Sequence, residues 1–347
     1  VFNDITAEEY QLLNLDELYW MWSRKIGFHH AGLAPIVKEF VEHLFLNKYI
    51  DVLFATETLS LGINMPAKSI MIDSAFKFDG VRTRLISKSE FLQLTGRAGR
   101  RGIDNKGFAY INYDRRIENN WYNDLFNLKP NNLMSSYSNS YGSVLNLCNK
   151  YGEEKGLKMI KKSFYSYQNK LNDKTLESNF KSKVEVLKNL NYFNDTKKNK
   201  LITETHRDNF LVGVELLENH SSQEFCLMFL SSGISTLKYE TSIHEKYSDL
   251  YTQFLIAQEK INILENNHGV KKKINVDISW FSIFNEFINS GNIEYTINKF
   301  DITLGDFIKA SREAAEISQK VYTIYKIENF NTISQKFINT IIQKTML

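Results

Sequence analysis

Proline and glycine are spread unevenly along this chain, and their distribution restricts the fold more than any other feature. All three prolines (Pro35, Pro66 and Pro130) and eight of the 16 glycines lie within the first 130 residues. Both residue types interrupt helices and strands, so this part needs short elements joined by turns. The proline-free remainder can form long helices. We therefore expect two architectures in one chain of 347 residues, a length that suits two or three domains.

The first part alternates short apolar runs with amphipathic stretches. Segment 36–45 (IVKEFVEHLF) carries apolar residues at helical spacing behind Pro35, a favourable first-turn residue. The runs 51–55 (DVLFA) and 69–76 (SIMIDSAF) suit strands that are covered on both faces, and 107–113 (GFAYINY) suits another strand. This alternation predicts an α/β fold with a parallel sheet flanked by helices.

From about Asn120 the chain becomes rich in lysine and asparagine, with apolar residues at helical spacing, which favours a mainly α region. One exception is 191–205, where two short apolar runs flank a polar turn and predict a β-hairpin. This segment follows the helical stretch 181–190, which is the order found at the end of a winged helix. We expect a winged helix there and a helical bundle from residue 209 onward.

The final helix of that bundle has a readable start. Thr303 is a favourable N-cap, and Asp306 stands three residues later at the position where an acid supports the cap. The helix is expected to run toward Ile327.

Overall composition excludes several classes of protein. With 43 basic and 40 acidic residues the net charge is only +3, so any nucleic-acid contact must be local. Cys148 and Cys226 lie far apart without metal-ligand spacing and indicate buried thiols in a reducing compartment. No run approaches 18 apolar residues, so we expect an intracellular protein with no membrane partner, cytoplasmic or, in a eukaryote, nuclear.

The most unusual stretch is 91–107 (FLQLTGRAGRRGIDNKG), where arginine and glycine concentrate. Ser87 and Glu90 have capping-box spacing, which predicts a helix through this region as far as Arg100. In such a helix Gln93, Arg97 and Arg100 would share one stripe. Two guanidinium groups aimed together suit a phosphate, especially one that gains charge in a transition state.

An alternative explanation needs no ligand, because basic residues near a helix C-terminus complement the helix dipole. That explanation does not account for Gly96 and Gly99, which are costly within a helix. With Ala98 between them, these glycines would let a ligand or a second domain approach closely.

The stretch 93–104 (QLTGRAGRRGID) resembles the sixth motif of superfamily 2 helicases, in the form typical of DExH-box, superkiller-type RNA helicases. Further segments resemble the same family in the same order: GFHHAGLAP at 27–35, VLFATETLSLGINMPA at 52–67, FKFDGVRTR at 76–84, YGSVLNL at 141–147, KKSFYSYQ at 161–168 and ITLGDFIKASREAAEISQKV at 302–321.

This resemblance implies three domains. Residues 1–115 would form the second RecA-like domain, clipped at its N-terminal end. Residues 116–208 would form a linker and winged helix, with no room for the arch that exosome-associated members insert. Residues 209–347 would form the helical DSHCT domain.

The resemblance also implies roles for the candidate phosphate-binding residues. Arg97 and Arg100 would reach the γ-phosphate of ATP, with Arg100 the better finger candidate and Gln93 in support. Nucleotide contacts would come from Gly62, Asn64, Gly96 and Gly99.

Nucleic acid would contact a different set of residues. Thr56 is expected on the backbone of the strand, with His30 as a polar contact nearby. Lys309 and Arg312 on the final helix would track single-stranded RNA in the manner of a ratchet. For Thr56 the alternative is a simple strand-to-loop turn, for His30 a structural histidine, and for the two basic residues a solvated face.

No metal site is expected, since the adjacent side chains of His29 and His30 diverge and no acidic cluster accompanies them. The sequence lacks both G-x-x-x-x-G-K-[ST] and DExH. The phosphate loop and the ligands of the Mg²⁺ that accompanies ATP are therefore expected in a first RecA-like domain outside this chain. Without that domain the chain should not hydrolyse ATP.

The expected whole is an ATP-dependent, 3′-to-5′ RNA helicase that unwinds or guides single-stranded RNA, with DNA as the other candidate substrate. Its partners would include the missing N-terminal RecA-like domain and RNA-decay machinery. The alternatives are a non-catalytic nucleic-acid-binding module and a fragment of a DNA helicase.

Overall fold

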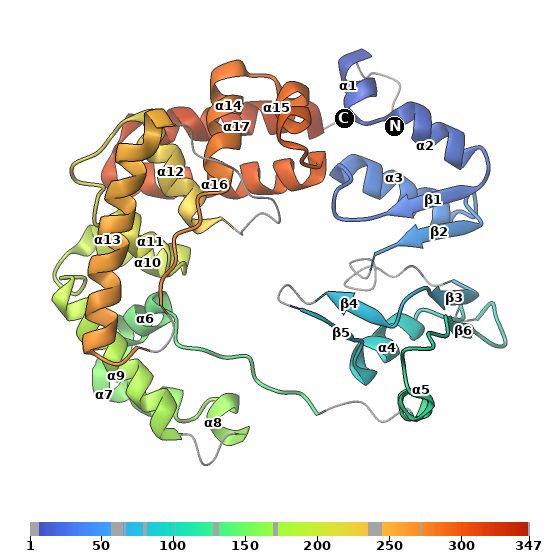
Figure 1. The fold of residues 1–347 in the computed structure, drawn as a ribbon, viewed down its shortest axis with the longest axis horizontal. Coiled ribbons are helices and arrows are strands. Elements are labelled where there is room, and N and C mark those ends of the chain that lie inside the picture. The colour runs from blue at the N-terminus through green and yellow to red at the C-terminus, as the bar shows by residue number, and fades with distance from the viewer. Residues whose placement is uncertain are drawn as a thin grey trace. The chain divides into compact units, whose positions relative to one another are not determined.

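The structure is a computed structural model of residues 1–347 (Figure 1). It describes residues 7–56, 65, 67–78, 82–100, 102–127, 132–168, 173–234, 245–270 and 273–345. The chain divides into two compact units, which we call unit 1 (residues 1–133) and unit 2 (residues 134–346). Each unit is described by itself.

Unit 1 mixes short helices and strands. Its elements are α1 (Ala7–Leu12), α2 (Leu15–Trp22), β1 (Ile26–His29), α3 (Pro35–Leu46), β2 (Val52–Ala55), β3 (Ser69–Ile72), β4 (Phe76–Phe78), β5 (Thr83–Leu85), α4 (Lys88–Thr95), β6 (Phe108–Ile111) and α5 (Asn119–Phe126). Strand β1 pairs with β2 and β3 with β6, both in parallel, while β4 and β5 form an antiparallel hairpin. The predicted α/β class is therefore confirmed.

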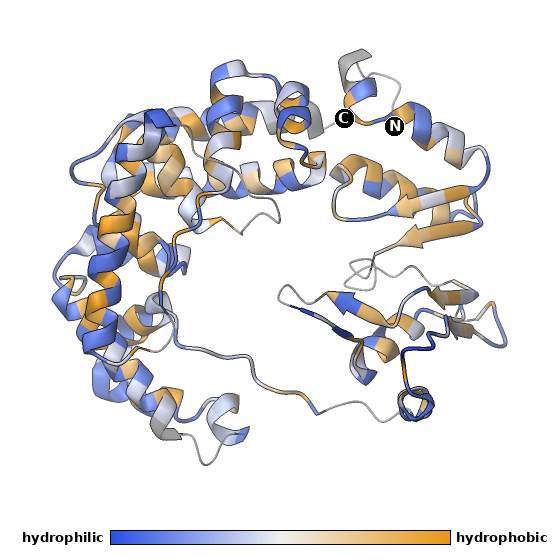
Figure 2. Cartoon of the chain, in the orientation of Figure 1, coloured by the Kyte–Doolittle hydropathy of each residue, from blue (hydrophilic) through white to orange (hydrophobic). Residues whose placement is uncertain are grey.

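The expectation that the strands are covered on both faces is wrong for the described residues. Val52 and Phe54 in β2 are 49% and 64% exposed, and Met71 in β3 is 68% exposed. The described strands form three separate two-stranded ladders, so each ladder has open edges and thin cover. Figure 2 shows how apolar residues concentrate on β1, β2 and α3.

One buried apolar cluster of unit 1 packs against α4, the helix that precedes Arg97 and Arg100. Ile72 from β3, Ile86, Phe91 from α4 and Leu125 from α5 form one buried cluster. Because Phe91 is only 3% exposed, α4 is fixed by its buried face against the sheet.

The start of α4 is fixed by an ionic network centred on Glu90. The predicted capping box is confirmed: the Ser87 side chain accepts from the Glu90 N–H, and Glu90 accepts from the Ser87 N–H at 2.7 Å. Arg84 donates both ends of its fork to Glu90 at 2.8 Å, and Lys77 lies 2.7 Å from the same carboxylate. The pKa of Glu90 is well below its usual range, and the hydrogen bonds from Arg84 are the main cause. The network joins the β4–β5 hairpin to α4.

Helices are the regular elements of unit 2 in its described residues, which agrees with the mainly α region expected there. Its elements are α6 (Tyr141–Tyr151), α7 (Glu153–Ile160), α8 (Phe164–Gln168), α9 (Asp173–Asn189), α10 (Thr196–Thr205), α11 (Phe210–Val214), α12 (Gln223–Gly233), the 3-10 helix η2 (Glu245–Tyr247), α13 (Ser248–Asn267), α14 (Trp280–Ser290), α15 (Ile293–Phe300), α16 (Leu304–Tyr325) and α17 (Glu328–Thr345). The helix predicted to start at Thr303 is α16, and the Thr303 side chain accepts from the Asp306 N–H at 3.1 Å as expected. The prediction that it is the final helix is wrong, because the chain turns after Tyr325 and continues as α17.

The β-hairpin predicted over 191–205 is wrong, because this segment forms α10. Asp195 caps the helix by accepting from the N–H groups of Lys197 and Lys198 at 2.9 and 3.0 Å. Leu201 and Ile202 on its apolar face are fully buried. Burial of this face among helices outweighs the two apolar runs that indicated strands. The predicted winged helix therefore lacks the β-hairpin from which it was inferred.

The sequence also predicted buried cysteine thiols and no segment that crosses a membrane. Cys226 is buried, and burial raises its pKa to about 12, whereas Cys148 is partly buried with a pKa of about 11. Among the described helices, none combines the length and apolar character that a membrane crossing needs.

We predict that Glu90→Gln lowers the free energy of unfolding by about 2 kcal/mol at neutral pH, because it removes the charged acceptor of several hydrogen bonds. The folded-state pKa lies below that of an unfolded glutamate, about 4.3, so the stabilisation is present above that pH and is lost as pH falls toward the folded-state value. Urea titrations at several pH values measure it. Glu118→Gln is the matched control, since Glu118 stands at the N-cap of α5 without a side-chain capping bond. Equal effects of the two variants would contradict the prediction.

Candidate functional site

Helix α4 ends at Thr95, so the prediction of one helix through Arg100 is wrong. Ala98 pairs with Ala67 in an isolated parallel bridge, and Gly99 has a φ of 90°, which no helix accommodates. Arg97 and Arg100 therefore lie in the turn after the helix. We call residues 97–100 and 102–104 the arginine turn.

The turn is held where three backbone segments meet. The Ala67 N–H donates to the Arg97 carbonyl at 3.0 Å, and the Gly99 N–H donates to the Ala67 carbonyl at 2.7 Å. Gly107 passes so close that a Cβ there would lie 2.4 Å from the carbonyl carbon of Ala98. Gly99 thus supplies a left-handed conformation and Gly107 a close approach, which accounts for two of the glycines in this stretch.

Arg100 is clamped by Asp104. Its Nε donates to Asp104 Oδ2 at 2.7 Å and its Nη2 to Oδ1 at 2.8 Å. The side chains of Arg100 and Asp104 are 28% and 9% exposed. The hydrogen bonds from Arg100 are the main reason why the pKa of Asp104 is well below its usual range, and the charge of Lys68 lowers it further. Among the described residues, Nη1 of Arg100 has no hydrogen-bond partner.

The structure brings the two arginines into one turn but leaves Gln93 on the helix before it. Gln93 is exposed in the second half of α4, and the Arg97 side chain is partly buried. The single stripe predicted for the three residues does not form, because the chain leaves the helix between Gln93 and Arg97. Gly62 and Asn64 lie outside the described residues.

Thr56 and His30 directly follow the carboxyl ends of β2 and β1. The Thr56 N–H donates to the His29 carbonyl at 3.1 Å, which extends the parallel pairing. The carboxyl ends of β1 and β2 therefore meet here, where open α/β sheets bind ligands. Thr56 is exposed, and His30 is partly buried with its Nδ1 accepting from the Gly32 N–H at 3.2 Å.

The neighbouring histidine has a different environment. His29 is 5% exposed and its Nε2 lies 2.9 Å from Oε1 of Glu42 on α3. That contact ties β1 to the helix that covers it, so His29 is a structural residue. Across the described residues, no group of three metal-ligating side chains gathers.

Lys309 and Arg312 are exposed one turn apart on α16. The opposite face of the helix is buried through residues that include Phe307, Ala310, Ala314, Ile317 and Val321. Lys320, further along the same helix, lies 2.7 Å from Glu316. A charged row on a firmly packed helix is compatible with a phosphate backbone and also with a solvated face.

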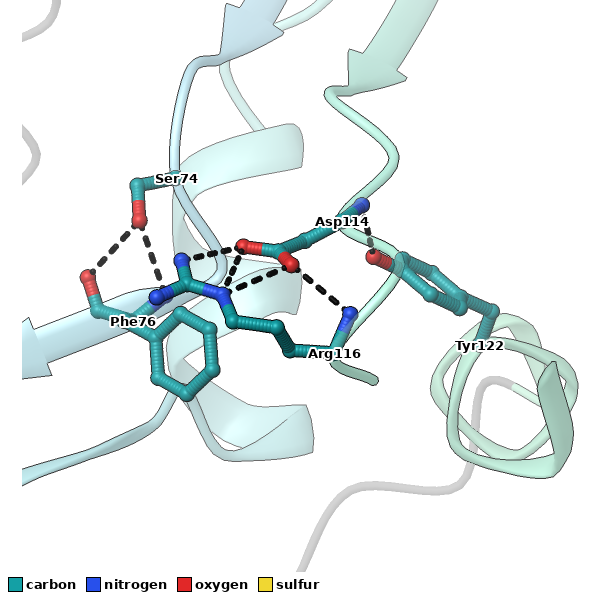
Figure 3. A network of polar contacts seen from close by, with 5 residues as sticks. All are labelled: Ser74, Phe76, Asp114, Arg116 and Tyr122. Carbon is teal, nitrogen blue, oxygen red and sulfur yellow. Dashed lines mark hydrogen bonds and ion pairs between the residues drawn. The ribbon is translucent and has the colours of Figure 1, made fainter. Parts of the chain in front are cut away.

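Sequence reasoning missed the two aspartate–arginine clamps of unit 1. The second lies beyond the carboxyl ends of β3 and β6 (Figure 3): Asp114 accepts from the N–H of Arg116 and from its guanidinium, and Tyr122 accepts from the Asp114 N–H. The Arg116 guanidinium also lies 4.9 Å from the centre of the Phe76 ring. The sequence did contain a signal for both clamps: Asp104 stands four residues after Arg100, and Asp114 stands two residues before Arg116.

Comparison with known proteins yields one family model and several relatives. The helicase conserved C-terminal domain matches residues 4–102, a range that includes Gln93, Arg97 and Arg100. The ATP-dependent RNA helicase mtr4 of Schizosaccharomyces pombe is 32% identical over 232 residues, which make up 67% of this chain and 20% of that protein.

Two further relatives show the same pattern. The exosome RNA helicase MTR4 of Homo sapiens is 39% identical over 164 residues, 47% of this chain and 16% of that protein. The DExH-box ATP-dependent RNA helicase DExH10 of Arabidopsis thaliana is 38% identical over 173 residues, 48% of this chain and 17% of that protein. The matched part of the chain thus spans at most 20% of the length of these three relatives.

We predict that Gly107→Ala destabilises unit 1 by about 3 kcal/mol, because the added methyl group would overlap the backbone at Ala98 and Gly99. Gly102→Ala is the control: Gly102 has a φ of 75°, but nothing lies within 4 Å of its Cβ position. Urea unfolding should place the Gly107 variant clearly below the control. A Gly107 variant as stable as wild type would show that the backbones do not meet as described.

Proposed function

Since the chain belongs to the superfamily 2 DExH-box helicases of the exosome-helicase type, whose conserved C-terminal domain it carries, we propose that it completes the ATP site of an ATP-dependent RNA helicase. In this proposal Arg100 and Arg97 meet the terminal phosphate of ATP and Gln93 supports them. The observation that carries the proposal is the Arg100 guanidinium, which is held along one edge while its Nη1 has no partner among the described residues.

The chemistry of the arginine turn fits one side of a nucleotide site. A guanidinium is permanently charged and fork-shaped, so a fixed one stabilises charge on a phosphate as the bond to the leaving group breaks. ATP supplies the phosphoanhydride bond whose hydrolysis drives unwinding. Gly96 at the end of α4 and Gly99 in the turn, with Gly62 and Asn64, are proposed on the nucleotide side. The phosphate loop and the Mg²⁺ ligands are proposed to come from a part of the protein outside this sequence.

Nucleic acid is proposed to bind at two places. Thr56 and His30 stand at the carboxyl ends of β2 and β1, where a hydroxyl and an imidazole suit a phosphate. Lys309 and Arg312 on α16 are proposed to follow a single strand as it moves, with unwinding in the 3′-to-5′ direction. Single-stranded RNA is the favoured substrate, because the relatives reported above are RNA helicases by name.

The wider setting follows from the same relatives. The human relative is named an exosome helicase, so we propose RNA-decay machinery as a partner and an intracellular location. A DSHCT-like role is proposed for the helices from residue 209 onward. The alternative function is a non-catalytic nucleic-acid-binding module, in which the arginine turn would have no phosphate to meet.

We predict that Arg100→Ala lowers RNA-stimulated ATP turnover of the full-length protein by at least about a hundredfold, because the charge on the breaking phosphate loses its partner. Steady-state phosphate release with and without single-stranded RNA measures the effect. Arg116→Ala is the matched control, since Arg116 is an arginine of the same unit held by a comparable aspartate clamp. Wild-type turnover in the Arg100 variant would remove the finger assignment and favour the non-catalytic alternative.

We predict that the double variant Lys309→Ala, Arg312→Ala weakens binding of single-stranded RNA and reduces the salt dependence of binding by about two phosphate contacts. Lys155→Ala, Lys158→Ala is the control, because these two exposed lysines have the same spacing on α7. Fluorescence anisotropy at several salt concentrations measures both. Competition with DNA of the same sequence distinguishes the two substrates. Equal losses in the two double variants would assign α16 no special role.

A further inference from the structure

Asp104 and Arg100 are joined through both backbone and side chains. The Asp104 N–H donates to the Arg100 carbonyl at 2.9 Å, and the Arg100 N–H donates to Asp104 Oδ2 at 2.9 Å. The guanidinium adds the two bonds from Nε and Nη2. Four hydrogen bonds thus join Arg100 to Asp104, so the direction of the arginine side chain depends directly on this carboxylate.

That dependence matters because Arg100 lies outside any helix. An arginine side chain has several rotatable bonds, which must be fixed before its guanidinium has one direction. A bidentate carboxylate fixes the plane of the guanidinium as well as its position. With the Nε edge occupied, Nη1 and the second hydrogen of Nη2 bond no described residue and can meet an incoming phosphate.

We propose that Asp104 is a positioning residue: it orients the Arg100 guanidinium so that the Nη1 side faces the terminal phosphate of ATP, without touching the nucleotide itself. This inference rests on the proposed function of Arg100. It assigns to Asp104 a share of the hydrolysis rate that acts only through the arginine.

Electrostatics alone predicts the opposite outcome, which makes the inference testable. Asp104 brings a negative charge near a site for a phosphate, and that charge opposes the attraction between Arg100 and ATP. If charge were all that mattered, Asp104→Asn would tighten ATP binding and preserve or raise turnover. If orientation matters more, the same change lowers kcat, because a displacement of about 1 Å at a catalytic group can cost about a hundredfold.

Unit 1 also contains a matched comparison. Asp114 holds Arg116 through the same three donors, with Nε at 2.9 Å from Oδ1, Nη2 at 2.5 Å from Oδ2 and the backbone N–H at 2.9 Å (Figure 3). The Arg116 side chain is 76% exposed and has no role in the proposed site. Asp114→Asn therefore removes the same kind of clamp from a position that should not affect hydrolysis.

The experiment measures ATP turnover at saturating single-stranded RNA for the full-length protein and its variants Asp104→Asn, Asp104→Glu, Asp114→Asn and Arg100→Ala. Thermal unfolding of each variant is recorded alongside. We expect Asp104→Asn to lower kcat by about tenfold or more with less than about a threefold change in KM for ATP. Asp104→Glu keeps the charge but lengthens the arm, so it should also lower kcat. Asp114→Asn should keep wild-type kcat whatever it does to the unfolding midpoint.

Each other outcome has a definite meaning. Wild-type or raised kcat in folded Asp104→Asn overturns the inference, and so does wild-type kcat in Asp104→Glu. If neither Asp104 variant folds, the carboxylate belongs to folding and the inference is overturned as well. If Arg100→Ala turns over ATP like wild type, the proposed function of the turn fails; slow Arg100→Ala with normal Asp104 variants defeats only the positioning role.

Discussion

The close passage of Gly107 over the backbone of Ala98 and Gly99 is the constraint on which the candidate site depends. A side chain at Gly107 would lie 2.4 Å from the Ala98 backbone, so the approach requires glycine. The same crossing lets Ala67 exchange hydrogen bonds with Arg97 and Gly99. Helix α4 must therefore end before the arginines, which places them in a turn.

The turn and the helix before it are held by different forces. Helix α4 is fixed by burial of Phe91 and by Glu90, whose carboxylate connects the helix start to Arg84 and Lys77 of the β-hairpin. Beyond Thr95 the helix no longer supports the chain, and the hydrogen bonds between Arg100 and Asp104 hold the turn instead. Rigid secondary structure thus carries a short polar turn, which is a common way to present a functional group on a precise scaffold.

Much of this was readable from the sequence. The alternation of elements predicted the α/β unit, and proline-free periodicity predicted the helical unit. The capping box at Ser87 and the N-cap at Thr303 were predicted with their partners. Two of the wrong predictions failed because a local pattern competed with a longer-range contact. The segment predicted as a hairpin, 191–205, contains the helix α10, whose apolar face is buried. The helix predicted to reach Arg100 ends earlier, because Gly107 crosses the backbone at Ala98 and Gly99. Spacing alone could not show either contact.

The central claim is that Arg100 acts on the reacting phosphate of ATP rather than on folding or nucleic-acid binding. The most direct test compares ATP binding with single-turnover hydrolysis in the full-length protein carrying Arg100→Lys, which keeps the charge and loses the planar fork. The account predicts an ATP dissociation constant within about threefold of wild type and a hydrolysis rate lower by about tenfold or more. Hydrolysis at the wild-type rate would contradict it.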